Sequence, residues 1–258
     1  MRKHITKPSI TVIMETVGGH QDRITKAIES FQAQTYKDAI LLVVNTHQER
    51  LVINNKPDNI LIHNVEDVFT RPVYQHIYCM KLVVTDCWTI LDDDDWITPN
   101  HLEQLVAMWN AQEERTESPL QVCIPHINAE YAEGIKELDV KGWMCSLFER
   151  LAPSEVDYVF KLFPKERICG SDTWIASNSY FDKRYSKGER TYNWDRTGSA
   201  HISQHEKWNE DKGTEHKFAL AKSYWTNKIS AHSLPLREIT LHNNNLRTPP
   251  QEPPQQID

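Results

Sequence analysis

The chain has 258 residues, enough for one large domain or two small ones, each with a hydrophobic core. Its five cysteines are odd in number and form no Cys-x-x-Cys pair, which argues against a disulfide framework or a zinc finger and predicts reduced thiols in the cytoplasm. The net charge of -7 argues against wholesale nucleic-acid binding but leaves room for a local basic face.

Apolar runs and helical spacing alternate along the first half of the chain. Short apolar runs predict buried strands, and apolar residues three and four apart predict helices with one face on a core. The predicted strands cover residues 10–14, 39–44, 59–62, 88–91 and 121–124, and the predicted helices cover 24–31, 73–84 and 98–112. This alternation predicts an α/β fold with a mostly parallel, doubly wound sheet, in which ligands bind beyond the carboxyl ends of the strands.

Two helix starts are predicted from local sequence. Thr98 followed by Pro99 is typical of a capped start with proline in the first turn, and Ser154 is expected to cap a second, short helix. The residues expected to face the core from these helices are Leu102, Leu105, Val106, Trp109, Val156, Val159, Phe160 and Phe163. The second half is otherwise less regular, with one strand expected at 173–176 and a disordered Pro/Gln-rich tail at 247–258.

Four consecutive aspartates, Asp92 to Asp95, directly follow the predicted strand at 88–91. Four like charges at such close spacing repel one another. A hard divalent cation such as Mg²⁺ or Mn²⁺ is the usual way to hold them, because both ions prefer oxygen ligands. The alternative is a solvated acidic turn at the surface, which is the ordinary setting of a short charge run.

Three segments resemble GT-A glycosyltransferases of the family 2 type. They are the strand 11–16, the helix end 28–36 with its Ser-x-x-x-Gln-Thr-Tyr stretch, and the segment 91–99, which is similar to the family's Leu-Asp-x-Asp-Asp-x-x-x-Pro. The resemblance covers residues 8–110 well and continues weakly to about 245. It implies a GT-A domain over 1–246, with a nucleotide-sugar-binding half at 1–125 and an acceptor-side half at 126–246.

The resemblance also implies roles for the aspartates. Asp94 would ligate Mn²⁺ or Mg²⁺, and Asp92 would bind the nucleotide ribose or a water on the metal. Asp93 and Asp95 would support either role, and one of the four can instead cap the following helix. A bound cation suits the chemistry, because the nucleoside diphosphate is a poor leaving group until its developing charge is neutralised.

The nucleotide side departs from the family pattern. Thr16 ends the first strand as in the family, but the second strand ends in Asn45 where the family has an aspartate that holds the base. An asparagine can still hydrogen-bond a base or ribose, and the expected donor is a UDP-sugar. The family's Arg-Asn pair is absent. Arg71 can contact the diphosphate in its place, or be an ordinary surface arginine.

The family carries a Glu-Asp or Trp-Asp pair whose aspartate is the general base of inverting enzymes. Trp194 and Asp195 are the best match, and a carboxylate can take the proton from an acceptor hydroxyl. The alternatives are that Asp195 caps a helix, and that Asp172 is the base.

A late His-x-Asn-Asn-like segment places His242 near the diphosphate and metal, by resemblance to related transferases. A surface histidine in a polar turn is the other interpretation of His242, and His232 is the alternative residue for this role.

Basic and aromatic residues surround the proposed base. They are Tyr180, Phe181, Lys183, Arg184, Tyr185, Lys187, Arg190, Tyr192, Trp194 and Arg196. Such a stretch can hold a phosphate backbone and an extruded base, can stack on sugars, or can be a solvated loop.

The acceptor expected from this stretch is therefore either a hydroxymethylated pyrimidine in DNA, as for enzymes of the bacteriophage type, or a saccharide. A nucleotide-sugar binding module without turnover is the competing class. With no apolar stretch of roughly 20 residues and no apolar leader, we expect no membrane partner and a cytoplasmic enzyme, in the host cytoplasm if viral.

Overall fold

The fold of the chain is given by a computed structural model. The residues that it describes are 5–16, 21–46, 50–53, 56–65, 72–112, 114, 116–131, 133–139, 143–161, 180–185 and 188–195. The predicted strand at 173–176, the predicted tail at 247–258 and Phe163 lie outside these residues.

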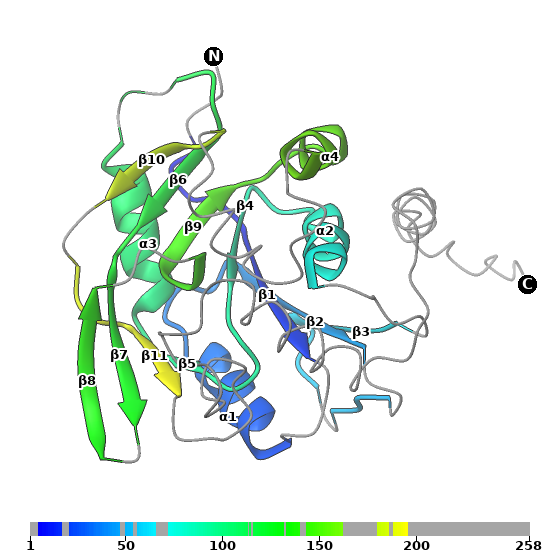
Figure 1. Ribbon diagram of the computed structural model, residues 1–258, viewed down its shortest axis with the longest axis vertical. Coiled ribbons are helices and arrows are strands. Elements are labelled where there is room, and N and C mark those ends of the chain that lie inside the picture. The colour runs from blue at the N-terminus through cyan, green and yellow to red at the C-terminus, as the bar shows by residue number, and fades with distance from the viewer. Residues whose placement is uncertain are drawn as a thin grey trace, which may run out of the picture.

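Seven strands form one large sheet in the order β10-β6-β9-β4-β1-β2-β3 (Figure 1). They are β1 (Ile10–Thr16), β2 (Ala39–Asn45), β3 (Ile60–Asn64), β4 (Cys87–Ile90), β6 (Leu120–Cys123), β9 (Ser146–Glu149) and β10 (Asp182–Tyr185). Neighbouring strands run parallel, except that β9 is antiparallel to both β4 and β6. The mostly parallel sheet predicted from the sequence is confirmed.

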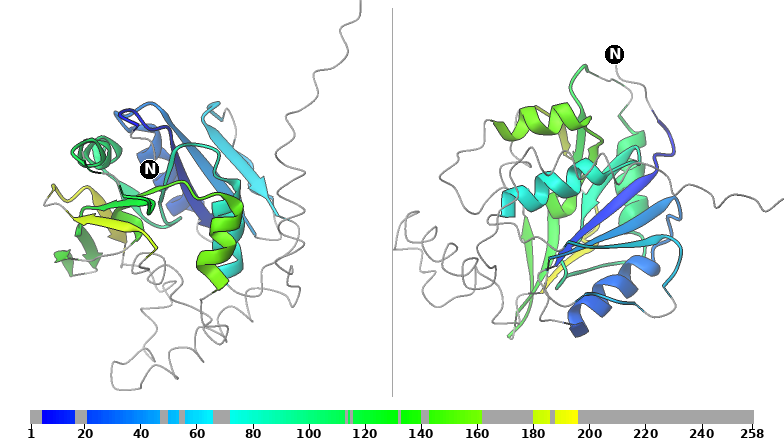
Figure 2. Two further views of the ribbon diagram at one scale, coloured as in Figure 1. Left: turned by 90° about the horizontal axis from the view of Figure 1, so that it is seen from above. Right: turned by 90° about the vertical axis from the view of Figure 1, so that its right-hand side faces the viewer.

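Helices cover both faces of this sheet (Figure 2). They are α1 (Gln21–Gln32), α2 (Pro72–Leu82), α3 (His101–Asn110) and α4 (Pro153–Lys161). Gln34, just after α1, ties that helix to α3, because its amide donates to the Thr98 carbonyl at 2.7 Å and accepts from the Leu102 N–H at 3.1 Å. On the other face α2 packs against α4, where the buried Lys81 ammonium lies 2.5 Å from the Asp157 carboxylate. No described helix is long and apolar enough to cross a bilayer.

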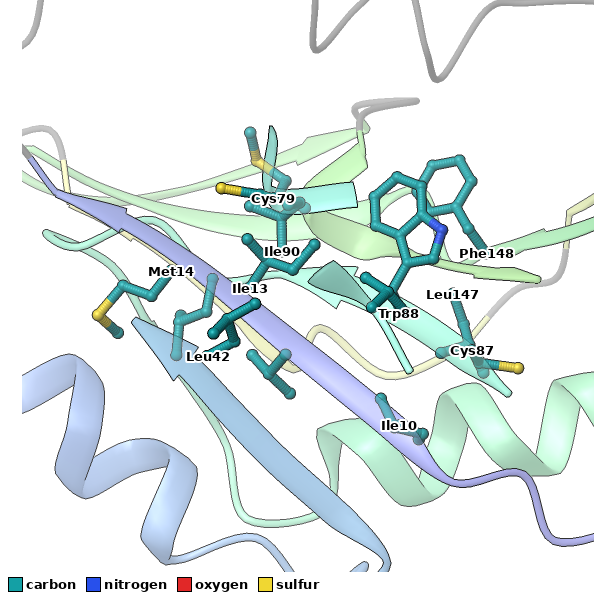
Figure 3. Packing of buried hydrophobic residues seen from close by; sticks show 14 of the residues in the cluster. Ile10, Ile13, Met14, Leu42, Cys79, Cys87, Trp88, Ile90, Leu147 and Phe148 are labelled. Carbon is teal, nitrogen blue, oxygen red and sulfur yellow. The ribbon is translucent and has the colours of Figure 1, made fainter. Parts of the chain in front are cut away.

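The core lies between the large sheet and these helices. Because parallel strands are covered on both faces, their sequences are nearly continuous apolar runs, and Ile10, Ile13 and Met14 of β1 are fully buried (Figure 3). Trp88 of β4 stacks on Phe148 of β9 with ring centroids 4.3 Å apart. Burying one such side chain contributes about 1.5–3 kcal/mol. The predicted core-facing residues that are indeed buried are Leu102, Leu105, Val106, Trp109, Val156, Val159 and Phe160.

A second, four-stranded sheet has the order β5-β11-β7-β8. Its strands are β5 (Trp96–Ile97), β7 (His126–Tyr131), β8 (Gly134–Asp139) and β11 (Tyr192–Asp195), and a short 3-10 turn, η1 (Trp143–Cys145), leads from this region into β9. β11 runs antiparallel to β5 and parallel to β7. Since β5 starts directly after Asp95, this sheet carries the chain from the aspartate run to the strand that ends in Asp195.

The predicted start of α3 is wrong by one turn. The helix begins at His101, so Thr98 and Pro99 precede it. The Thr98 hydroxyl donates to the Asn100 side-chain oxygen at 2.7 Å, and no side-chain cap is made by Asn100 itself. The Thr98 carbonyl accepts from the His101 N–H at 3.0 Å, which closes a turn before the helix proper.

The predicted cap of α4 is also wrong. The helix begins at Pro153, which places Ser154 inside the first turn. The Glu155 carboxylate accepts from the Ala152 N–H at 2.7 Å, so a glutamate side chain closes the helix start where the serine was expected to do so.

His101 makes folding stability sensitive to acid. Its ring is buried, Nδ1 lies 2.7 Å from the Thr191 hydroxyl, and Nε2 has no hydrogen-bond partner among the described residues. Burial lowers the pKa of His101 from 6.5 to about 3. Between about pH 6.5 and about pH 3, His101 is therefore protonated in the unfolded chain but not in the folded chain. The free energy of unfolding falls as the pH falls through this range.

The variant His101→Asn keeps a hydrogen-bonding atom near the Nδ1 position but has no proton to gain. The free energy of unfolding should fall by about 1.4 kcal/mol more in the parent protein than in the variant between about pH 7.5 and about pH 5.5. Urea unfolding at the two pH values measures this difference. Parallel pH curves for the two proteins would show that His101 is not the group responsible.

Candidate active site

Polar side chains stand at the carboxyl ends of three neighbouring strands. The register pairs Thr16 of β1 with Asn45 of β2, and Asn45 with Asn64 of β3. The Thr46 N–H donates to the Thr16 carbonyl at 3.0 Å, which continues the pairing past the strand ends. The structure thus brings together the predicted Thr16 and Asn45, and adds Asn64, which the sequence analysis missed.

The asparagine pair also fastens the segment that follows β2. The Asn64 Oδ1 accepts from the Asn45 Nδ2 at 2.7 Å and from the Leu51 N–H at 2.8 Å, while the Asn64 Nδ2 donates to the Leu51 carbonyl at 3.2 Å. Asn45 is buried as a result. The carboxyl ends of β1, β2 and β3 therefore carry a row of fixed polar residues, Thr16, Asn45 and Asn64, called the polar wall below.

The aspartate run follows β4 at the same edge of the sheet. The Leu91 N–H donates to the Ile13 carbonyl of β1 at 2.9 Å, and the Asp95 N–H donates to the Asp92 carbonyl at 3.1 Å, which closes a tight turn. The first three carboxylates are partly exposed, whereas Asp95 is fully buried. Only the first three are placed to meet a ligand.

The Asp95 carboxylate is hydrogen-bonded to other residues of the protein. Its carboxylate accepts from the Tyr192 hydroxyl at 2.8 Å and from the Asp195 N–H at 2.8 Å. The same hydroxyl accepts from the Asp92 N–H at 3.2 Å. Burial, together with the charges of Asp92 and Asp94, raises the pKa of Asp95 well above its ordinary value. Asp95 therefore does not cap α3, and its carboxylate joins the aspartate turn to β11.

This junction places Asp195 beside the aspartate turn. Asp195 is the last residue of β11, and the residues that follow it, on which a helix cap would depend, lie outside the described part. Arg23 of α1 lies between the two acidic groups, with Nε 3.7 Å from the Asp195 Oδ2 and Nη1 3.8 Å from the Asp94 Oδ2. No local sequence pattern marks Arg23 as a site residue, because only the fold shows that the start of α1 faces both carboxylates.

Hard oxygen ligands at this turn fit a divalent cation that a second molecule also ligates. Among the described residues, no three His, Cys, Asp or Glu side chains converge into a site made by protein alone. Mg²⁺ is ordinarily held by one or two carboxylates, with phosphate oxygens and waters completing its shell. Asp94, alone or with one neighbouring aspartate, would supply that number of carboxylates.

Three predicted site residues, Arg71, Asp172 and His242, lie outside the described residues, as does His232. The basic and aromatic stretch is divided between two sheets, with Lys183 to Tyr185 on β10 and Tyr192 to Asp195 on β11. Two of its cations face carboxylates of the protein, at 3.0 Å from Arg184 to Asp182 and at 3.3 Å from Arg190 to Glu137.

No protein-family model matches the chain, and no curated protein matches it. Among solved structures, it is similar to S. aureus TarS 1–349 in complex with UDP-GlcNAc, with a TM-score of 0.59 at 14% identity over 90% of this chain and 69% of that one. The TarS complex with UDP gives 0.53 at 11% identity over 90% and 68% of the two chains.

A longer structure of S. aureus TarS gives a TM-score of 0.56 at 13% identity over 87% of this chain. The chain spans only 44% of the length of that protein. At these identities the likeness shows the fold, and it confirms the GT-A type of α/β fold predicted from the sequence.

Proposed function

We propose that this protein transfers a sugar from a nucleotide-diphosphate sugar, a UDP-sugar, to an acceptor hydroxyl with the help of Mn²⁺ or Mg²⁺. One observation carries the proposal. At the carboxyl edge of the large sheet, Asp95 holds the partly exposed aspartate turn beside the backbone of Asp195, and the Arg23 guanidinium lies within 4 Å of both the Asp94 and Asp195 carboxylates. That edge is where open α/β sheets bind ligands, and the fold is shared with a protein crystallised with UDP-GlcNAc.

The nucleoside is assigned to Thr16 and Asn45 of the polar wall, with Asp92 and Asp93 next to the ribose and diphosphate. The register of β1 and β2 and the partial exposure of the two aspartates support this assignment. Arg71 is a further candidate for the diphosphate.

Asp94 would hold the cation, with His242 as a second candidate ligand. When bound, the cation acts as a Lewis acid that neutralises charge on the departing diphosphate. The role of the protein is to keep the Asp94 carboxylate partly exposed and fixed at the strand end, which the turn closed between Asp92 and Asp95 supports.

Asp195 is the proposed general base. Its backbone is fixed by the hydrogen bond to Asp95, and its side chain is about as deeply buried as that of Asp94, at 11% and 12% exposure. As the acceptor oxygen bonds to the anomeric carbon, its proton passes to the Asp195 carboxylate and the nucleoside diphosphate leaves with the electrons of the broken bond. A single displacement of this kind inverts the anomeric centre.

Tyr192 is proposed to position this base, because its hydroxyl bridges Asp95 and the Asp92 N–H. In Tyr192→Phe, kcat should fall about tenfold, with a smaller rise in KM for the donor through Asp92, since a lost buried hydrogen bond costs about 1–3 kcal/mol. Tyr36→Phe is the matched control: its hydroxyl donates to the Pro8 carbonyl at 2.9 Å, before β1. Steady-state kinetics of both variants decide the matter, and an unchanged kcat in Tyr192→Phe would remove Tyr192 from this role.

For the acceptor, the described residues favour a saccharide over a hydroxymethylated pyrimidine in DNA. A phosphate backbone needs uncommitted cations on one face, whereas Arg184 and Arg190 each face a carboxylate and the stretch is split between two sheets. The Tyr185 side chain is exposed, and an aromatic ring can stack on a sugar.

Two experiments test the proposal in sequence. Calorimetry with Mn²⁺ should show that UDP binds more tightly than GDP, CDP or TDP, and a clear preference for another nucleotide would overturn the donor assignment. Incubation with UDP-sugars and either simple glycans or hydroxymethylated DNA should then show transfer to a glycan. Metal-dependent UDP binding with no turnover on any acceptor would favour a binding module without catalysis.

A further inference from the structure

The Arg23 side chain faces both Asp94, the proposed metal ligand, and Asp195, the proposed general base. It comes from the first turn of α1, and its guanidinium lies within 4 Å of Asp94 on one side and of Asp195 on the other, at 3.8 and 3.7 Å. Asp94 lies in the turn between β4 and β5, whereas Asp195 ends β11, 101 positions later in the sequence. One guanidinium therefore offsets the repulsion between two carboxylates that the fold forces together.

The guanidinium is held by charge more than by hydrogen bonds. Both distances are longer than a hydrogen bond, and the buried Nη1 has no hydrogen-bond partner among the described residues. An arginine held this way can move when another cation or an anion enters. Lys26, one turn along the same helix, is different, because its ammonium lies 3.0 Å from the centroid of the Trp96 ring.

We propose that Arg23 competes with the divalent cation for Asp94, and so makes binding of the cation depend on the diphosphate of the donor. The inference rests on the proposed function. A divalent cation on Asp94 would lie close to the positively charged Arg23 guanidinium. Coulomb repulsion at such a distance lowers the affinity of the site for the divalent cation by about tenfold or more. A diphosphate relieves this repulsion because it supplies negative charge to both cations. Binding of the cation and of the nucleotide is then cooperative, and by linkage the coupling is reciprocal.

Titration of the chain with Mn²⁺, in which electron paramagnetic resonance measures the free ion, tests this competition. Arg23→Met keeps most of the side-chain length and removes the charge, so Mn²⁺ should bind at least about tenfold more tightly without nucleotide. With saturating UDP the gain should shrink, because the diphosphate has already relieved the repulsion. Lys26→Met, which removes one positive charge from the same helix, should bind Mn²⁺ within about twofold of the parent.

Arg23→Gln keeps a polar group without the charge and should show the same tighter Mn²⁺ binding. It replaces Arg23→Met in this test if the methionine variant does not fold. Equal or weaker Mn²⁺ binding by the folded Arg23 variants, while the parent binds Mn²⁺, overturns the competition and leaves the proposed function standing. Equal tightening in Lys26→Met overturns it as well, because the effect is then one of net charge. Failure of every protein to bind Mn²⁺, with or without UDP, overturns the inference together with the metal dependence of the proposed function.

Discussion

The Asp94→Ala variant should lose sugar transfer by about 10²–10⁴-fold and lose metal-dependent nucleotide binding, while its fold and unfolding midpoint stay close to those of the parent. The loss in rate is large because a metal acting on a leaving phosphoryl oxygen supplies several kcal/mol, and each 1.4 kcal/mol is about a factor of ten. The fold should survive because Asp94 is partly exposed and its ion-pair contact with Arg23 is long, at 3.8 Å.

Asp58→Ala is the control for this variant, since Asp58 is an exposed carboxylate in the turn before β3 and away from the aspartate run. It should transfer sugar at the parent rate and bind UDP in the same metal-dependent way. Near-native transfer by Asp94→Ala in buffer containing a chelator would mean that the metal assignment is wrong.

The Asp195→Asn variant should transfer sugar about 10²–10⁴-fold more slowly, the usual cost of losing a general base. The asparagine keeps the shape of the side chain, and the Asp195 N–H that donates to Asp95 belongs to the backbone, so the junction between the turn and β11 should persist. UDP affinity should change little, because Asp195 is assigned to the acceptor side. Rate measurements at saturating donor, with calorimetry of UDP binding, give both quantities.

Asp172→Asn is the companion variant, because Asp172 was the alternative base in the sequence. It should retain most of the activity. A dead Asp172→Asn beside an active Asp195→Asn would exchange the two assignments, and activity in both would mean that the acceptor proton leaves by another route.

The first half of the fold could be predicted because its strands are buried on both faces. Runs such as 10–14 and 39–44 are almost wholly apolar, and that signal does not depend on distant partners. The small sheet gives no such signal. In β7 only Ile127 and Ala129 are buried, and β8 is exposed along most of its length. The same holds for β10 at the edge of the large sheet, which reads Asp-Lys-Arg-Tyr and has no buried residue. These strands are defined by their pairing partners, which a single sequence does not display.

The site residues likewise include some that local sequence can identify and others that only the fold can identify. Consecutive aspartates at a strand end can be recognised locally, and Trp194 and Asp195 by their resemblance to a known pair. The separate role of Asp95 depends on Tyr192, which is 97 positions away, and the place of Arg23 depends on how α1 faces β11. The local sequence does not distinguish the four aspartates, and only the tertiary fold shows that Asp95 is buried while the other three are partly exposed.

Release of UDP from UDP-sugars, measured on the purified chain with Mn²⁺, with a chelator and in Asp94→Ala, tests the central claim most directly. At least one UDP-sugar should be consumed with Mn²⁺, a saccharide acceptor should accelerate its consumption, and both the chelator and the substitution should stop it. Consumption that continues unchanged in the chelator and in Asp94→Ala, or UDP binding without consumption of any sugar nucleotide, would contradict the claim.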